Sequence, residues 1–189
     1  KVGLVTCPYR GEHPLNLPAK MEAFGIGADF IPSSFVAYYF NGYRFAFGST
    51  IAIRRTILDS IDGFTALKDE LADDYMLAKY TCNAGFEVVL SRYVVADVIG
   101  NEVFSNMSAR RLRWAKTSRA MQPGPYLGSI VTHGLVLTSL ASVPAIIRGQ
   151  WLPGIGSIGA VLLVRIVTTI HNLTKTENSR LLGDLYLLP

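Results

Sequence analysis

Acidic side chains are almost missing from the second half of this chain of 189 residues. After Glu102 the next acid is Glu177, and only basic charges fall between them. The net charge of +4 is therefore the average of a mixed first part and a basic, apolar second part. The basic residues border long apolar runs and lack a base-binding motif, which argues against nucleic acid as a partner. Anionic lipid headgroups or substrate phosphates fit this pattern better.

Cysteine is also scarce, with only Cys7 and Cys82 in the sequence. They form no CxxC pair and have no metal-ligand spacing, so we expect reduced thiols and no metal site in this stretch. An initiator methionine and a signal-peptide pattern are missing as well. The chain begins inside an apolar run at residues 2–5 and ends in another at 185–189. We therefore expect a fragment of a longer protein.

Strand and helix patterns alternate over the first part, which predicts an α/β domain. The aromatic run at 35–40 followed by Asn41-Gly42 predicts a β-hairpin that returns over residues 43–47. A loop is expected across residues 12–20, and Thr56 is the expected N-cap of a short helix. Further strands are predicted at 2–7, 51–53, 86–90 and 93–98, and helices near 21–24, 56–61 and 72–83.

The second part has helical and membrane-like patterns. Residues 106–120 predict a basic amphipathic helix that lies in a membrane interface. Leu127–Ile147 has 21 residues without a formal charge, enough for a helix to cross roughly 30 Å of hydrocarbon. Leu152–Ile170 is a second candidate span, weakened by Pro153 and Arg165. A pair of buried core helices is the alternative interpretation of these two segments.

Basic residues flank both candidate spans on the same side. They crowd the segment before the first span, and Lys175 and Arg180 follow the second. The positive-inside rule then predicts an integral membrane protein with residues 1–120 on the cytosolic face. The chain is thus divided into a domain at 1–105, an interfacial helix at 106–125, and a membrane region at 126–189 with spans near 127–147 and 152–172.

Two adjacent acids, Asp73 and Asp74, stand at the start of the helix predicted at 72–83. Neighbouring residues on a helix point about 100° apart, so only one of the two can face a given cleft. Acids in a first helical turn are ordinary helix stabilisers, which is the structural interpretation of the pair. The chemical interpretation is a general base, and it depends on what else lies nearby.

A second motif, forty residues later, combines two arginines with an indole. Arg110 and Arg113 are three positions apart on one helical face, and Trp114 is adjacent. Guanidinium groups bind phosphate bidentately and stay charged, which suits a diphosphate leaving group. A solvated basic helix with an interfacial tryptophan is the alternative. Gly48 and Ser49 follow an apolar run and could let a ligand approach the backbone closely.

The order of these motifs resembles a known enzyme family. A GLV strand is followed by an FxxGS motif at 45–49, then ADDY at 72–75, then RxxRW at 110–114, then apolar spans. This order is similar to the catalytic core of family 2-type inverting glycosyltransferases, whose signature is D, DxD, (E/D)D and (Q/R)xxRW. Arg110 in the last motif makes ceramide glucosyltransferases of family 21 the closest group. Bacterial glycosyltransferases associated with hopanoid biosynthesis are also similar.

The resemblance implies the C-terminal part of a GT-A nucleotide-diphospho-sugar transferase domain followed by transmembrane α-helices. Asp74 would be the base that takes the acceptor proton, and Asp73 would modulate it. The groups expected to line the donor diphosphate and the acceptor entry are Arg110, Arg113, Trp114, Gly48 and Ser49.

The resemblance also implies partners. We expect a nucleotide-sugar donor, most simply a UDP-sugar, which gives glucose or N-acetylglucosamine to the hydroxyl of a ceramide-like or hopanoid lipid. A divalent metal, Mg or Mn, would bind a DxD motif upstream of this stretch, so these residues alone are expected to be inactive. Thr6 stands where animal ceramide enzymes have histidine, which favours a bacterial-type lipid.

Two other functions stay open at this point. A processive polysaccharide synthase shares the same motifs, although such enzymes usually carry glutamine where this chain has Arg110. A non-catalytic, membrane-anchored module that binds anionic lipid would need Asp74 only as a helix stabiliser.

Overall fold

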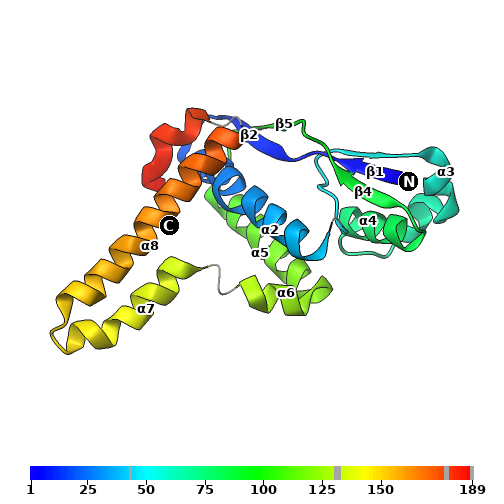
Figure 1. Ribbon diagram of the computed structural model, residues 1–189. Coiled ribbons are helices and arrows are strands. Elements are labelled where there is room, and N and C mark those ends of the chain that lie inside the picture. The colour runs from blue at the N-terminus through cyan, green and yellow to red at the C-terminus, as the bar shows by residue number, and fades with distance from the viewer. Residues whose placement is uncertain (43, 130–132, 177–178, 188–189) are drawn as a thin grey trace.

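The computed structural model describes the chain except for residues 43, 130–132, 177–178 and 188–189 (Figure 1). Strands and helices alternate in the first part, and the second part is helical, in agreement with the predicted order. The strands are β1 (Val2–Thr6), β2 (Tyr9–Pro14), β3 (Ile51–Ile53), β4 (Glu87–Leu90) and β5 (Val95–Gly100). The helices before β5 are α1 (Leu17–Gly25), η1 (Ile26–Phe30), α2 (Ile31–Asn41), α3 (Arg55–Ser60), η2 (Gly63–Leu67) and α4 (Asp73–Asn83). Those after it are α5 (Phe104–Met121), α6 (Pro123–Gly128), α7 (Gly134–Ile147), α8 (Trp151–Lys175) and η4 (Ser179–Leu187).

The first sheet has the order β3-β1-β4, with β1 in the centre. β3 pairs with β1 antiparallel and β4 pairs with it parallel. Leu4 of β1 is fully buried and packs with Leu77 and Ala78 of α4 and with Val88 of β4. The predicted strands at 2–7, 51–53 and 86–90 and the helix at 72–83 are confirmed, because alternating apolar residues and a shared core support one another here.

A second sheet joins β2 and β5 in parallel, with Tyr9 opposite Val95 and Glu12 opposite Val98. The prediction of a loop across residues 12–20 is wrong, because β2 extends to Pro14 and α1 begins at Leu17. Pairing with a strand more than eighty residues away leaves no trace in local periodicity.

The predicted hairpin at 35–47 is also wrong. Residues 17–41 instead form three successive helices, α1, η1 and α2. The aromatic run lies on α2, whose first turn contains Pro32, and Gly42 ends the helix with φ 69°. Asn-Gly is a hairpin signal and also a helix C-terminal signal, and packing of Ile31 against Tyr9 and Phe47 decides for the helix.

The remaining local signals of the first part hold with one exception. Gly85 has φ +83° just after α4, as expected for a glycine that follows a helix. Thr56 is not an N-cap, since α3 begins one residue earlier at Arg55. The Nε atom of Arg55 forms an ion pair with Asp59 Oδ1 at 2.9 Å.

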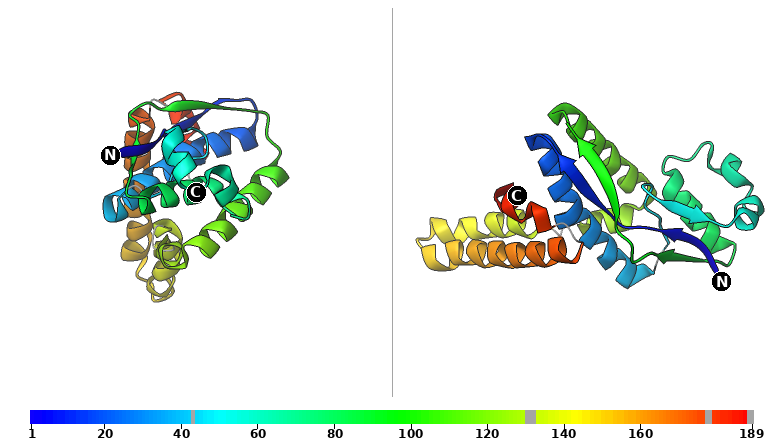
Figure 2. Two further views of the ribbon diagram at one scale, coloured as in Figure 1. Left: turned by 90° about the vertical axis from the view of Figure 1, so that its right-hand side faces the viewer. Right: turned by 90° about the horizontal axis from the view of Figure 1, so that it is seen from above.

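The helices α7 and α8 form an antiparallel hairpin that projects from the rest of the molecule (Figures 1 and 2). Gly154 lets them approach closely, since a Cβ atom there would lie 2.7 Å from Ile146. The Oγ atoms of Ser142 and Ser157 are 2.9 Å apart across the hairpin.

The two candidate spans differ in length from the prediction. α8 has 25 residues and is, by length and composition, apolar enough to cross a membrane. The first candidate is not one helix: its residues fall into α6 and α7, and residues 130–132 lie outside the described part. α7 has 14 residues, so its length is roughly 21 Å, less than the ~30 Å of a bilayer core.

The C-terminal part of the chain packs back against the first part. Leu173 of α8 is fully buried beside Ala23 and Phe24 of α1. The Nζ atom of Lys20 lies 3.0 Å from Asp184 Oδ1 in η4. Residues 179–187 therefore do not open a further apolar span over the described range; they cover α1.

One buried hydroxyl fixes the loop that precedes β3. Thr6, fully buried on β1, accepts a hydrogen bond from the backbone N–H of Phe47 at 2.8 Å. The same hydroxyl is 3.0 Å from the carbonyl oxygen of Thr50, to which it donates. Residues 47–50, which include Gly48 and Ser49, are thus held against the central strand.

Replacing Thr6 with valine should destabilise the fold by about 1–3 kcal/mol, because the buried N–H of Phe47 loses its acceptor. Urea unfolding of the purified protein measures this change. Thr81→Val is the matched control: Thr81 is equally buried, but its hydroxyl only donates to Leu77 within α4. Equal losses for the two variants would contradict the proposed role of Thr6.

Candidate active site

The two adjacent acids at the start of α4 have different surroundings. Asp73 is exposed, and its Oδ1 accepts a hydrogen bond from the N–H of Asp74 at 2.9 Å. Asp74 is half-buried, and its Oδ1 accepts from the N–H of Tyr75 at 2.7 Å. The expectation that only one of the pair can face the interior is confirmed, and Asp74 is the one that does.

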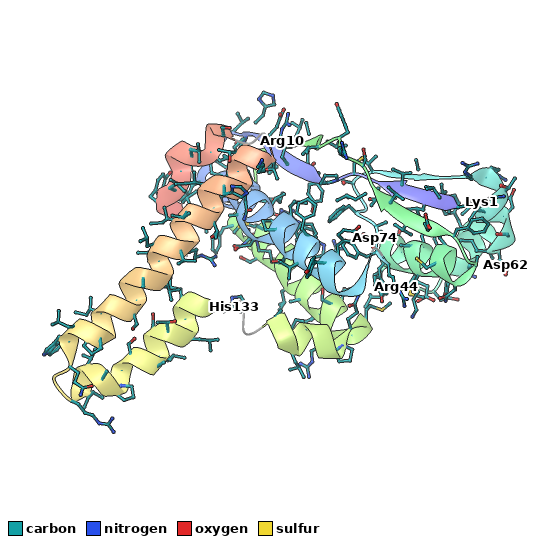
Figure 3. All side chains as sticks on the ribbon, viewed as in Figure 1. Lys1, Arg10, Arg44, Asp62, Asp74 and His133 are labelled. Carbon is teal, nitrogen blue, oxygen red and sulfur yellow. The ribbon has the colours of Figure 1, made fainter. Side chains whose placement is uncertain are left out.

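Asp74 faces the loop held by Thr6, in the middle of the first part (Figure 3). A Cβ atom on Gly48 would lie 3.1 Å from Asp74 Oδ2, so the glycine leaves space for the carboxylate. Burial raises the pKa of Asp74, and the nearby charge of Asp73 raises it further. Hydrogen bonds from the N–H groups of Tyr75 and Gly48 act in the opposite direction without cancelling the increase in the pKa.

An aromatic cluster begins directly beside this loop. The ring centroid of Phe47 lies 6.0 Å from that of Tyr9 and 5.8 Å from that of Phe30, and both pairs meet edge-on. The ring centroids of Tyr9 and Phe30 are 5.7 Å apart. These three residues come from the loop before β3, from β2 and from η1, so the cluster joins three parts of the fold.

The RxxRW motif reaches this cluster through its tryptophan. The indole of Trp114 stacks on Phe30 with ring centroids 6.3 Å apart and an interplanar angle of 25°. The guanidinium carbon of Arg110 lies 5.9 Å from the Trp114 ring centroid, a cation–π geometry. Trp114 is 40% exposed, so part of its ring stays open to a ligand or to lipid.

Arg110 itself lies between two carboxylates. Its Nη2 atom is 2.7 Å from Glu102 Oε2 and 3.1 Å from Glu22 Oε1. The hydrogen bond from Arg110 lowers the pKa of Glu102. Arg111 also contacts Glu22, with Nε 3.1 Å from Oε2. The first arginine of the motif is therefore occupied within the protein.

Arg113 differs from its two neighbours. It is exposed, and within the described ranges it makes no hydrogen bond or ion pair. Ser49 is exposed beside Gly48. The structure thus brings Asp74 and Gly48 together and Arg110 and Trp114 together. The aromatic cluster connects these two pairs, and Arg113 projects from α5.

Tyr9 is the electrostatic link between the two pairs. It is 9% exposed, and burial raises the pKa of its hydroxyl well above the ordinary value. The negative charges of Asp97, Glu22 and Asp74 raise that pKa further, and Arg110 lowers it. The charges of both the candidate base and the arginine motif therefore act on the pKa of this hydroxyl.

Sequence reasoning missed Tyr9, Phe30, Phe47 and Glu22. Glu22 had a usable signal, since Ala19, Glu22, Ala23 and Ile26 follow helical spacing and are all buried on one face. Phe47 lies in the predicted return strand of the hairpin, and the sequence predicts no helix or strand at Tyr9 or Phe30. Their meeting depends on the packing of β2 and η1, which no local pattern encodes.

Potential metal ligands do not gather in the part of the chain that the structure describes. No three histidine, cysteine, aspartate or glutamate side chains there lie close enough to hold an ion. The described residues bring together a half-buried carboxylate at Asp74, positive charge on α5 and a partly exposed ring at Trp114.

Comparison with known proteins defines the class of protein to which this site belongs: the chain is a glycosyltransferase. It belongs to glycosyl transferase family 21, the ceramide glucosyltransferase family, whose family model matches residues 1–189. Members of this family generally use nucleotide-sugar donors and lipid acceptors. The resemblance carried by the ordered motifs is confirmed, and so is the enzyme class. No solved structure gives a significant match to this chain.

The raised pKa of Asp74 predicts a pH-dependent cost to stability. The folded state keeps a proton on this carboxyl at higher pH than the unfolded chain does. Ionisation therefore costs stability above the folded pKa, and this cost disappears as pH falls toward the unfolded value. Asp74→Asn removes the ionisation. As the pH falls from neutral to about pH 4, wild type should therefore gain stability relative to this variant.

Thermal unfolding midpoints of both proteins across this pH range test the prediction. Asp69→Asn, which removes an exposed charge elsewhere, is the control and should run parallel to wild type. Parallel curves for wild type and Asp74→Asn would show that burial does not perturb Asp74.

Proposed function

We propose that the intact protein is a membrane-bound, inverting glycosyltransferase that moves a hexose from a nucleotide-sugar donor to a lipid hydroxyl. Glucose or N-acetylglucosamine is the proposed sugar, and a UDP-sugar is the proposed donor. The acceptor is a ceramide-like or hopanoid lipid. Thr6 in place of the histidine of animal ceramide enzymes favours the bacterial type of lipid.

The observation that carries this proposal is the environment of Asp74. Its carboxylate is half-buried, has a raised pKa, and faces a glycine that leaves it accessible space. A base is most effective when its pKa is close to the operating pH, and burial moves Asp74 in that direction. An aspartate that served only as a helix cap would have no need of this setting.

The proposed reaction is a direct displacement. Asp74 accepts the proton of the lipid hydroxyl as its oxygen attacks the anomeric carbon of the sugar. The bond from that carbon to the diphosphate oxygen breaks on the opposite face, so the configuration inverts. Asp73 acts on the reaction only through its charge, which raises the pKa of Asp74.

Positive charge must meet the diphosphate as it leaves. Arg113 is exposed and uncommitted among the described residues, and it lies one turn from Arg110 on α5. A guanidinium can bind two phosphate oxygens at once. Trp114 offers a partly exposed aromatic face to the acceptor chain or to the sugar.

The apolar hairpin supports membrane attachment. Its outward residues include Leu140, Ile147 and Leu152, which are 65%, 79% and 89% exposed. Such a surface is unfavourable in water and favourable in lipid. We infer that the hairpin inserts into the bilayer and that α8 is the helix long enough to cross it. The cations of α5 face the cytosolic leaflet.

The catalytic part is proposed to be the C-terminal portion of a GT-A domain. The divalent metal, Mg or Mn, is proposed to bind a DxD motif upstream of this stretch. The steps above give the roles proposed for the residues of this stretch.

Asp74→Asn in the full-length enzyme should lower kcat by about 10²- to 10⁴-fold, because asparagine cannot accept the acceptor proton. Transfer from nucleotide-sugar to lipid in detergent or vesicles measures the rate. Membrane association should stay unchanged, and Asp69→Asn should keep full activity. An unchanged rate for Asp74→Asn would remove this residue from the reaction.

The same assay separates the alternative functions. One sugar per lipid with inverted configuration, read by NMR of the product, supports the proposal. A growing sugar polymer would identify a processive synthase. Vesicle binding without any transfer by the full-length protein would leave a non-catalytic lipid-binding module.

Arg113→Gln should raise the donor KM by about 10- to 100-fold, the loss expected for one charge-assisted hydrogen bond to phosphate. Steady-state kinetics over a range of donor concentrations gives the KM. Arg119→Gln, an exposed arginine at the last turn of α5, is the matched control and should leave the KM unchanged. An equal rise in both variants would indicate general electrostatics instead of a specific contact.

A further inference from the structure

Glu22 is a buried carboxylate that two arginines of α5 share. Its side chain is 5% exposed, the lowest value among the acids that form ion pairs in the described part of the chain. Oε1 is 3.1 Å from Arg110 Nη2, and Oε2 is 3.1 Å from Arg111 Nε. Each carboxylate oxygen thus contacts a different guanidinium, and both contacts run from α1 to α5.

The surroundings of this carboxylate are adapted to it. Arg111 also donates from Nη2 to the carbonyl oxygen of Met21 at 3.2 Å. A Cβ atom on Gly25 would lie 2.5 Å from the same Nη2, so a larger residue there would displace the guanidinium. A buried ion pair is costly to form and strongly destabilising to break on one side.

The contacts of Arg110 suggest what this ion pair does. Its guanidinium is held by Glu22 and by Glu102, at 3.1 and 2.7 Å. From this position it lies over the ring of Trp114, which also stacks on the ring of Phe30. Arg110 and Phe30 thus hold the indole between them, and Arg110 is held in turn by Glu22, which is buried, and by Glu102.

We propose that Glu22 is a positioning residue for the RxxRW motif. It holds Arg110 in an internal ion pair, and Arg110 in turn holds Trp114 at the orientation that receives substrate. Arg110 is then a structural part of the motif, and Arg113 is the arginine left for the diphosphate. This inference rests on the proposed transferase function for its kinetic consequences, but the orientation of Trp114 can be measured without it.

The main experiment is a double-mutant cycle in the full-length enzyme. Glu22→Gln keeps the side-chain shape but removes the charge, and it should lower kcat/KM by about tenfold or more, equivalent to about 1.4 kcal/mol. In a Trp114→Phe background the same change should cost less than about twofold, because its effect passes through the indole. If the ion pair of Glu22 only held α1 against α5, Glu22→Gln would lower kcat/KM by the same factor in both backgrounds. That result would overturn the proposal.

Two further variants refine the cycle. Glu12→Gln is the matched control: it also removes the carboxylate of a short ion pair with arginine, at 2.7 Å from Arg10, but on β2 away from α5. It should leave kcat/KM unchanged. Glu22→Asp keeps the charge and therefore the fold, but its shorter side chain cannot reach both arginines. It should fall between wild type and Glu22→Gln.

Fluorescence tests the positioning independently of activity. The spectrum of Trp114 is obtained by subtracting the emission of Trp114→Phe from that of each protein. Glu22→Gln and Glu22→Asp should move this emission to longer wavelength, because a released indole gains contact with water. Glu12→Gln should not move it. An unchanged emission in both Glu22 variants would overturn the proposal, even if the Trp114→Phe enzyme were too slow for the cycle.

These two measurements also separate the two hypotheses. Absence of sugar transfer in the wild-type protein, together with a shift in Trp114 emission on Glu22→Gln, would reject the proposed function and keep the positioning role. Normal sugar transfer by the wild-type protein, with no shift in Trp114 emission on Glu22→Gln, would keep the proposed function and reject the positioning role.

Discussion

The shared ion pair of Glu22 with Arg110 and Arg111 joins the two halves of this molecule. Helix α1 belongs to the part built around the sheets, and α5 leads into the apolar hairpin. Because a buried charge must be compensated, this contact fixes the position of α5 against α1 more strictly than apolar packing would. The stacking of Trp114 on Phe30 follows from it, and so does the continuity of the aromatic cluster toward Asp74.

The site contains carboxylates whose environments give them opposite properties. Glu22 meets two guanidiniums, and its charge is balanced. Asp74 accepts hydrogen bonds from backbone N–H groups and has an acid beside it, and burial raises its pKa. The first environment suits a residue that orients others, and the second suits a residue that accepts a proton. The two lie at opposite ends of one aromatic cluster, with Tyr9 responding to the charge of both.

The apolar hairpin adds a second constraint on how this enzyme works. α8 begins in an exposed, apolar stretch and ends buried against α1, while Arg165 pairs with Asp29 of η1 at 3.0 Å. The apolar hairpin and the part built around the sheets are therefore joined by direct contacts of α8 with η1 and α1.

The sequence alone determined the family and the order of elements around β1 and α4. These depend on short-range spacing, which a linear pattern contains. Only the tertiary structure decided that residues 17–41 are helical, that residues 9–14 pair with β5, and that Arg110 is held by Glu22. The physical reason is the same in each case. An Asn-Gly pair, an isolated tyrosine or an arginine can adopt several states locally, and contacts with residues far along the chain select one of them.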